Sequence, residues 1–136
     1  MSEAPDEPVR DLAQLLRGMR PRLHEGTVVF CPLARDGTLP AGAIAWFREV
    51  EGETVILPLP AARAARLTPA FEAAWITLEV HSALDAVGLP AAVSAALAAE
   101  GIACNIVAAL RHDHLFVPVA RAADAMRALG RLSAGA

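Results

Sequence analysis

The chain has 136 residues, of which 55% are hydrophobic but only 4% aromatic, and its formal net charge is −3 at pH 7. This length suits one domain or two small modules with a shared core, and the apolar content excludes an intrinsically disordered chain. Because the arginines are scattered along the sequence, nucleic-acid binding is not expected, since it needs clustered cations. No stretch has the roughly 20 consecutive apolar residues of a membrane-spanning helix.

The first half of the sequence predicts a tail, a helix and three strands. The tail spans residues 1–6. The helix begins at Glu7–Pro8, because proline lacks the N–H that the first helical turn leaves unused, and it ends at Pro21. Further along the chain, residues 34–42 form a loop with two glycines and a proline. The other elements are strands at 27–33, 43–50 and 53–59, a tight turn at 51–52 and a short helix at 60–67.

The second half opens with a strand at 75–81 in which apolar and polar side chains alternate. One face of this strand carries Ile76, Leu78 and Val80, and the other carries Trp75, Thr77, Glu79 and His81. A turn at 82–88 leads into a helix that Gly101 closes. The remaining elements are strands at 102–110 and 115–118 and a helix at 119–132.

This order of elements predicts an α+β fold made of two modules. The second half, β-α-β-β-α, lacks only the last strand of the ferredoxin-like βαββαβ plan, and the first half reads α-β-β-β-α. We expect modules at residues 1–68 and 69–136, each with an antiparallel sheet and helices on one face. Their sheets would complete each other, and exchange of a strand between them is one way to do so.

One run in the second half carries a family resemblance. The sequence ITLEVHSALDAVGLPAAVSAALAAEGIACNIVA, residues 76–108, resembles the ACT domain: a strand, a turn with glycine, a helix, and a Gly-Ile pair before the next strand. The runs DLAQLLRGMRPRL, AWFREVEGETVILP, HDHLFVP and AADAMRALGRL extend the likeness over nearly all of the chain beyond the tail. The whole chain resembles small bacterial proteins of two tandem ACT-like modules, whose function is undefined.

The resemblance implies a small ligand, usually an amino acid, bound by the strand–helix turn. The residues that it points to are Ser82, Asp85, Ala86, Val87, Gly88 and Leu89 of the turn, and Asn105 in the second strand. Free N–H groups at a helix start favour a carboxylate, and glycine allows a close approach. ACT modules often carry Asp-x-Pro-Gly at this turn, whereas here Asp85 lies three residues before Gly88 and Val87 takes the place of the proline.

Two of these residues also have a purely structural interpretation. Gly88 fits a turn that only glycine enters easily, and Asn105 fits a buried amide that backbone groups satisfy. The sequence alone leaves both alternatives open.

The run His112, Asp113 and His114 allows three interpretations. Two histidines at alternate positions of a strand lie on one face and suit a metal. Histidine and aspartate are also common in hairpin turns, and the run also suits a ligand or interface role. We expect a turn and assign no metal ligands.

Charged residues outside the turn are open to two interpretations. If a second sheet covers the face with Thr77 and Glu79, the Glu79 carboxylate needs a partner, for which Arg48 is a candidate. If water covers that face, the alternation marks a half-exposed strand. Arg48, Glu49 and Glu51 form either a polar ligand cluster or a solvated hairpin turn.

Catalytic chemistry finds little support in the sequence. Ser82 and Ser94 lack a nearby base, and no nucleophile elbow, phosphate loop or paired-cysteine metal motif is present. Cys31 and Cys104 lie in apolar runs and are expected to be buried free thiols of a cytoplasmic protein. We therefore expect a regulatory protein without enzymatic activity or cofactor that binds an amino acid, as a homodimer. The alternative is a ligand-free module for oligomerisation or partner docking, through exposed sheet edges.

Overall fold

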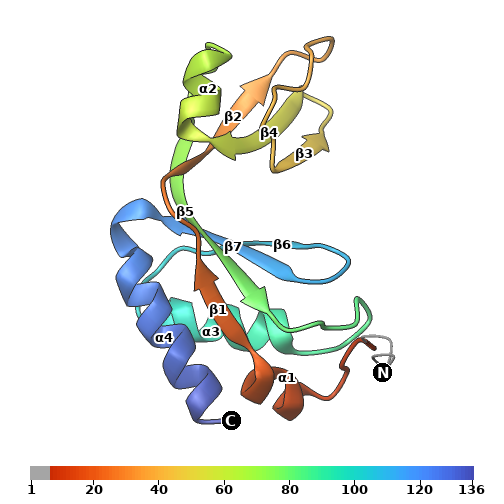
Figure 1. The fold of residues 1–136 in the computed structure, drawn as a ribbon, viewed down its shortest axis with the longest axis vertical. Helices are drawn as coiled ribbons and strands as arrows, with labels where there is room; N and C mark the ends of the chain where they lie inside the picture. Colours follow the sequence, from red (N-terminus) through yellow and green to blue (C-terminus); the bar gives the residue numbers. More distant parts are fainter. Residues whose placement is uncertain (1–6) are drawn as a thin grey trace, which may run out of the picture.

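Strand β5 (Phe71–Glu79) joins two modules in the computed structural model, which describes residues 7–136 (Figure 1). The predicted tail at 1–6 lies outside the described residues. Residues 71–73 of β5 pair with β2 (Val28–Leu33), and residues 73–78 pair with β7 (Asp113–Pro118). The sheet order is β3-β4-β2-β5-β7-β6 with antiparallel neighbours, so β5 belongs to both modules.

The upper module in Figure 1 consists of β2, β3 (Ala45–Arg48), β4 (Glu53–Pro58) and α2 (Leu59–Ala64). Pro60 lies in the first turn of α2, where its missing N–H loses no hydrogen bond. The core under α2 consists of Val29, Cys31, Leu33, Val55, Leu57 and Ala62. Residues 34–44 connect β2 to β3 without a helix, so this module lacks the first helix of the ferredoxin-like plan.

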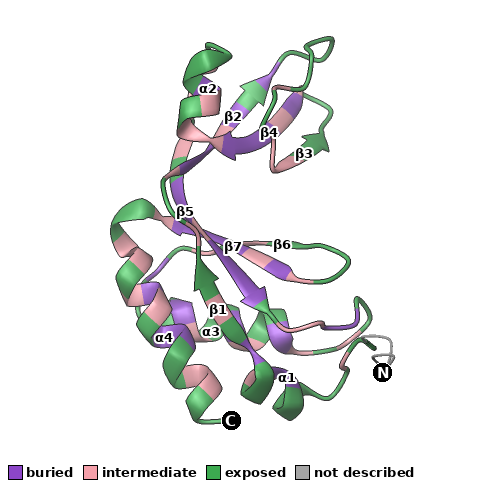
Figure 2. Ribbon diagram, viewed as in Figure 1, coloured by how far each residue is buried: buried purple, intermediate pink, exposed green. Residues whose placement is uncertain are grey.

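The lower module has a sheet of β1 (Arg20–Leu23), β5, β7 and β6 (Asn105–Ala108). Helices α1 (Leu12–Gly18), α3 (Leu89–Ala99) and α4 (Ala122–Ala134) pack on one face of it, α4 following a short 3₁₀ turn η1 (Val119–Arg121). The buried side chains of this core include Leu15, Ile76, Leu78, Val93, Leu97, Leu115 and Leu129. Figure 2 shows that β5 is buried over most of its length.

The structure confirms the predicted fold class, including the exchanged strand. β1 comes from the first half of the sequence but pairs with β5, with Arg20 opposite Glu79 and Leu23 opposite Ile76. It supplies the strand that the second half lacks. Helix α1 also packs on this lower core, so residues 12–23 lie in space with the second half.

Two predicted boundaries near the N-terminus are wrong. The first helix begins at Leu12, because the side chain of Asp11 caps it by accepting a hydrogen bond from the Gln14 N–H at 3.0 Å. It ends at Gly18, and Pro21 lies inside β1, which the sequence did not predict. The edge position explains this, since proline is tolerated where no partner needs its N–H. No described helix is long and apolar enough to span a membrane.

Candidate functional site

The predicted turn connects β5 to α3 and is held by the segment before α1. The Val9 N–H donates to the carbonyl oxygen of His81 at 2.7 Å, and the Ala83 N–H donates to the carbonyl oxygen of Val9 at 3.0 Å. Ser82 and Ala83 are buried by this contact. The turn is therefore built from two segments that lie far apart in the sequence.

A pocket of about 220 Å³ lies on the outer side of this turn. Its lining residues are Pro8, Arg10, His81, Ser82, Ala83, Leu84, Asp85 and Leu110. The Arg10 guanidinium lies 3.3 Å from the Asp85 carboxylate, with both side chains well exposed, at 64% and 75%. Leu84 and Leu110 are also exposed and add an apolar wall. The pocket thus offers a cation, an anion and apolar surface to one small molecule.

The inner side of the turn offers much less space. A cavity of about 50 Å³ lies there, lined in part by Leu89, Pro90 and Asp113. Asp113 is buried, and burial raises the pKa of its carboxyl, although His114 and His112 oppose this shift. A carboxylate beneath the start of α3 disfavours a second carboxylate at the same place. This cavity has room for water rather than for an amino acid.

Gly88 is explained by the packing of the turn. It precedes α3 with φ = +110°, and a Cβ placed on it would lie 3.0 Å from Leu12 Cδ2. Leu89 is buried in the core and Ala86 packs against that core, whereas Val87 is exposed. Leu89 can thus offer only backbone groups to a ligand. A ligand role for these residues stays a prediction.

Asn105 lies away from the turn. It begins β6 and is exposed, and its cross-strand partner is Phe116. Ala108, which lines the inner cavity, is three residues further along β6, a separation of about 10 Å in a strand. The structure therefore brings Ser82, Asp85 and the other turn residues together, but it does not add Asn105 to them.

A second group of polar side chains lies on the face of the lower sheet opposite the helices. His24 stacks on Trp75, with ring centroids 3.6 Å apart and planes inclined by 10°. His24 Nε2 lies 2.7 Å from Thr77 Oγ1, which lies 3.0 Å from His114 Nδ1. Trp75 Nε1–H donates to the same Nδ1 at 3.1 Å. Sequence reasoning placed Trp75 and Thr77 on one face but missed His24 and His114 as their partners.

The predicted turn over His112, Asp113 and His114 is correct only in part, because Asp113 and His114 belong to β7. His112 lies in the turn between β6 and β7, where its carbonyl oxygen accepts from the Ala109 N–H at 3.0 Å. Asp113 points to the helix side and His114 to the open face, since they are adjacent in β7. Among residues 7–136, no group of three or more histidine, cysteine, aspartate or glutamate side chains is arranged to hold a metal.

Glu79, on the same face of β5 as Thr77, has a partner other than Arg48. Glu79 lies 3.9 Å from the guanidinium of Arg22 on β1, and its side chain is 44% exposed. Arg48 is in the upper module, so its proposed pairing with Glu79 is wrong. The half-exposed interpretation of this face holds for Glu79, while Thr77 is buried by its histidine neighbours.

The histidine pair predicts an acid-sensitive fold. Burial, and secondarily neighbouring cationic groups, lower the pKa of both His24 and His114 below 6.5. A proton on His114 Nδ1 would displace the Trp75 donor. With lowered pKa values, the folded chain binds fewer protons than the unfolded chain in mild acid. The free energy of unfolding is therefore unaffected above pH 6.5 and falls as the pH drops through the lowered pKa values of the two histidines.

Thermal unfolding from pH 7.5 to 5 should show this loss of stability, and the loss should be smaller in His24→Gln. An equal loss in the wild-type protein and in His24→Gln would contradict the prediction.

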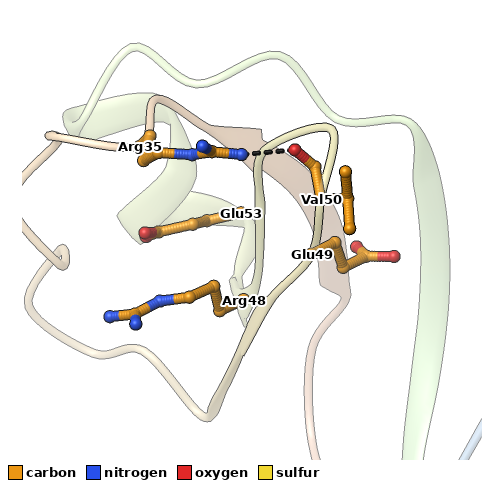
Figure 3. Close-up of a pocket in the computed structure, with 5 residues that line it drawn as sticks. All are labelled: Arg35, Arg48, Glu49, Val50 and Glu53. Atoms are coloured by element: carbon orange, nitrogen blue, oxygen red, sulfur yellow. Dashed lines mark hydrogen bonds between the residues drawn. The ribbon is translucent and has the colours of Figure 1, made fainter.

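A pocket of about 580 Å³ lies at the β3–β4 hairpin (Figure 3). Arg35, Arg48, Glu49, Val50 and Glu53 line it, and Arg35 donates to the Val50 carbonyl oxygen. Glu53 is buried and accepts from Trp46 Nε1 at 2.8 Å. Its side chain extends between those of the two arginines in Figure 3. The acidic and basic groups here partly balance one another, which is typical of a solvated hairpin end.

Comparison with known proteins agrees with the two-module architecture. Models of the ACT domain match residues 7–74 and residues 70–131. No match was found among curated proteins. A Vibrio cholerae protein of unknown function, named a possible transport protein, is 41% identical over 90% of this chain and 95% of that one, with a TM-score of 0.76.

More distant structures share the fold. A protein from Agrobacterium tumefaciens is 18% identical over 85% of this chain and 89% of its own length, with a TM-score of 0.65. The ligand-free regulatory subunit of aspartate kinase from Thermus thermophilus is 13% identical over 82% of this chain and 95% of its own, with a TM-score of 0.59. From its two family matches and its Vibrio relative, the chain belongs to the ACT-domain family and carries two ACT domains in tandem.

Proposed function

We propose that the protein is a regulatory module without catalysis of its own, and that it binds a small aliphatic amino acid in the outer pocket of the turn. The observation that supports this most is the pair of opposite charges, Arg10 and Asp85, beside two exposed leucines in one 220 Å³ pocket. A free amino acid carries the complementary charges on one carbon. Asn105 has no part in this pocket.

The chemistry of binding follows from the exposed ion pair. A surface pair of this kind contributes only about 0–1 kcal/mol, so a zwitterion can replace it at little cost. The Arg10 guanidinium would then bind the α-carboxylate, and Asp85 would bind the α-ammonium group. The side chain would lie against Leu84 and Leu110. Because Arg10 precedes α1 and Asp85 precedes α3, the ligand would tie these two segments together.

The test compares ligands that differ by one charge. Valine should raise the unfolding temperature and give a saturable calorimetric signal, since a ligand at 100 times its Kd adds about 2.7 kcal/mol to stability. Valinamide, which lacks the carboxylate, and 3-methylbutanoate, which lacks the ammonium group, should bind at least about tenfold more weakly.

Matched variants locate the site. Arg10→Gln and Asp85→Asn should each weaken valine binding by at least about tenfold, whereas Arg17→Gln and Asp36→Asn, which change exposed charges elsewhere, should not. Binding that is unchanged in both pocket variants would show that the amino acid binds elsewhere.

The chain would act as a homodimer, and exposed sheet edges favour this. β3 and β6 are the end strands of the sheet, and Phe47 and Val107 on them are exposed, at 70% and 37%. Unpaired edges of this kind pair with other strands. If no amino acid binds but light scattering finds a dimer, the ligand-free alternative explains the protein better: a module for self-association or partner docking.

A cytoplasmic location without cofactor completes the proposal. Cys31 and Cys104 are both free thiols, but only Cys31 is buried as predicted, whereas Cys104 is half-buried. Partial burial still raises the pKa of Cys104 to about 11. Protonated free thiols suit a reducing compartment, where disulfides are rare.

A further inference from the structure

Another cavity, of about 430 Å³, lies between the two modules on the sheet face opposite the helices. Its lining residues are Ala43, Ile44, Ala45, Trp75, Val107, Ala109, His114 and Phe116. Residues 43–45 come from the upper module and the others from the lower one. The volume is within the usual range for small-molecule sites, about 300–1,000 Å³.

The strand register explains why these side chains meet. Phe116 lies opposite Trp75 on one side and Asn105 on the other, and His114 lies opposite Thr77 and Val107. Cross-strand partners point to the same face of a sheet. Trp75 and Phe116 from one cross-strand row, with His114 and Val107 from the next, therefore lie on the floor of the cavity, and residues 43–45 form its roof.

The floor contains one polar group with a fixed role. The Trp75 indole can only donate, so the Nδ1 atom of His114 that it contacts at 3.1 Å must be an acceptor. The proton of the neutral ring is then on Nε2, which makes Nε2 a hydrogen-bond donor. Among the described contacts, the hydrogen bonds of His114 are all made by Nδ1.

The neighbours hold this imidazole in place. Thr77 Oγ1 contacts His114 Nδ1, and His24 contacts Thr77 and stacks on Trp75. Arg22 Nη2 lies 3.4 Å from His24 Nδ1 and can only donate to it, so the ring proton of His24 is on Nε2. His24 Nε2 therefore donates to Thr77, and Thr77 donates to His114. These contacts all lie on the Nδ1 side of the ring. The donor is thus oriented before any ligand arrives.

We propose that this cavity binds a small, mainly apolar, uncharged molecule whose one oxygen acceptor takes a hydrogen bond from His114 Nε2. No lining residue carries a permanent charge, so a charged ligand would lose its hydration without a counter-ion. Trp75, Phe116 and Ile44 provide apolar contacts for its body. Because the ligand would touch both modules, it would favour one arrangement of the upper module relative to the lower one. This site is separate from the pocket of Arg10 and Asp85 and does not depend on it.

The experiment uses two aromatic probes of similar size. Acetophenone has a carbonyl acceptor, and ethylbenzene has none. In a ¹H–¹⁵N spectrum of the full chain, acetophenone should shift the Trp75 indole N–H signal in a saturable way. The Trp46 signal, from the hairpin, should stay in place. Ethylbenzene should bind at least fivefold more weakly, and equal binding of the two probes would overturn the role of His114.

Matched variants test the location. Ala45→Leu fills the roof of the cavity and should weaken acetophenone binding at least tenfold, whereas Ala64→Leu adds the same side chain to the exposed surface of α2 and should not. Arg10→Gln should leave acetophenone binding unchanged. Absence of a saturable Trp75 shift in the wild-type protein would overturn the proposal, whether or not Ala45→Leu folds. So would a shift of the same size in a folded Ala45→Leu variant.

Discussion

Replacing Phe116 with alanine is expected to lower the free energy of unfolding by about 3–5 kcal/mol. Phe116 is 1% exposed and meets the ring of Phe30 edge to face, with centroids 5.3 Å apart. It belongs to a cluster that joins the modules, together with Val28, Ile56 and Ala73. Loss of its ring leaves a cavity where the two modules meet, because β2 and β7 are both fixed by pairing to β5.

The matched control is Phe47→Ala on β3. Phe47 is 70% exposed, so its removal should change stability by no more than about 0.5 kcal/mol. Urea unfolding, followed by circular dichroism, measures both variants. If Phe116→Ala loses no more stability than Phe47→Ala, the cluster around Phe116 does not stabilise the fold. A second unfolding transition in Phe116→Ala alone would show that this cluster couples the unfolding of the two modules.

Gly88→Ala is expected to destabilise the protein by about 2–4 kcal/mol, from two separate causes. A φ of +110° is strained for any residue with a Cβ, and that Cβ would lie 3.0 Å from Leu12 Cδ2. The side chain would therefore push α1 away from the turn. A substitution of Gly88 therefore changes the stability of the turn whether or not a ligand binds there.

Two other glycines separate these causes. Gly101 has φ = +69° but no atom within 4 Å of its would-be Cβ, so Gly101→Ala should show the backbone strain alone, about 1–2 kcal/mol. Gly130 lies within α4 with open space around it, so Gly130→Ala should stabilise the protein by about 0.5–1 kcal/mol. Thermal unfolding ranks the three variants. If Gly88→Ala is no worse than Gly101→Ala, the contact with Leu12 has no energetic effect.

The sequence predicted those elements whose signal is local. The alternation in β5 and the apolar spacing of α3 are set by burial within one element, so the strand, the helix and the fold class followed from them. β1 was missed because Arg-Pro-Arg-Leu is only four residues long and contains a proline, which the sequence analysis took as the end of a helix. It is a strand only because β5 presents a free edge beside it.

The sites depend on contacts between distant residues, which no local pattern encodes. Arg10 and Asp85 are brought together by the pairing of Val9 with the turn. His24 reaches Trp75 because β1 pairs with β5. The turn itself was predictable from the family resemblance, but its basic partner was not, since Arg10 fell within a predicted helix. For His24, the signal that could have pointed to it is its position directly after β1.

The position of β1 in the sequence also affects how the chain can fold during its synthesis. The strands and helix of the upper module lie between residues 28 and 73, so all their partners are available once that stretch has emerged. The lower sheet pairs residues 20–23 with 76–79 and then needs β7 at 113–118. The upper module is in effect an insertion in the lower one. β1 can pair only after residues 76–79 of β5 have been synthesised. Since closing a longer loop adds little entropy cost but slows folding, we expect the upper module to form first and the lower module to close around it.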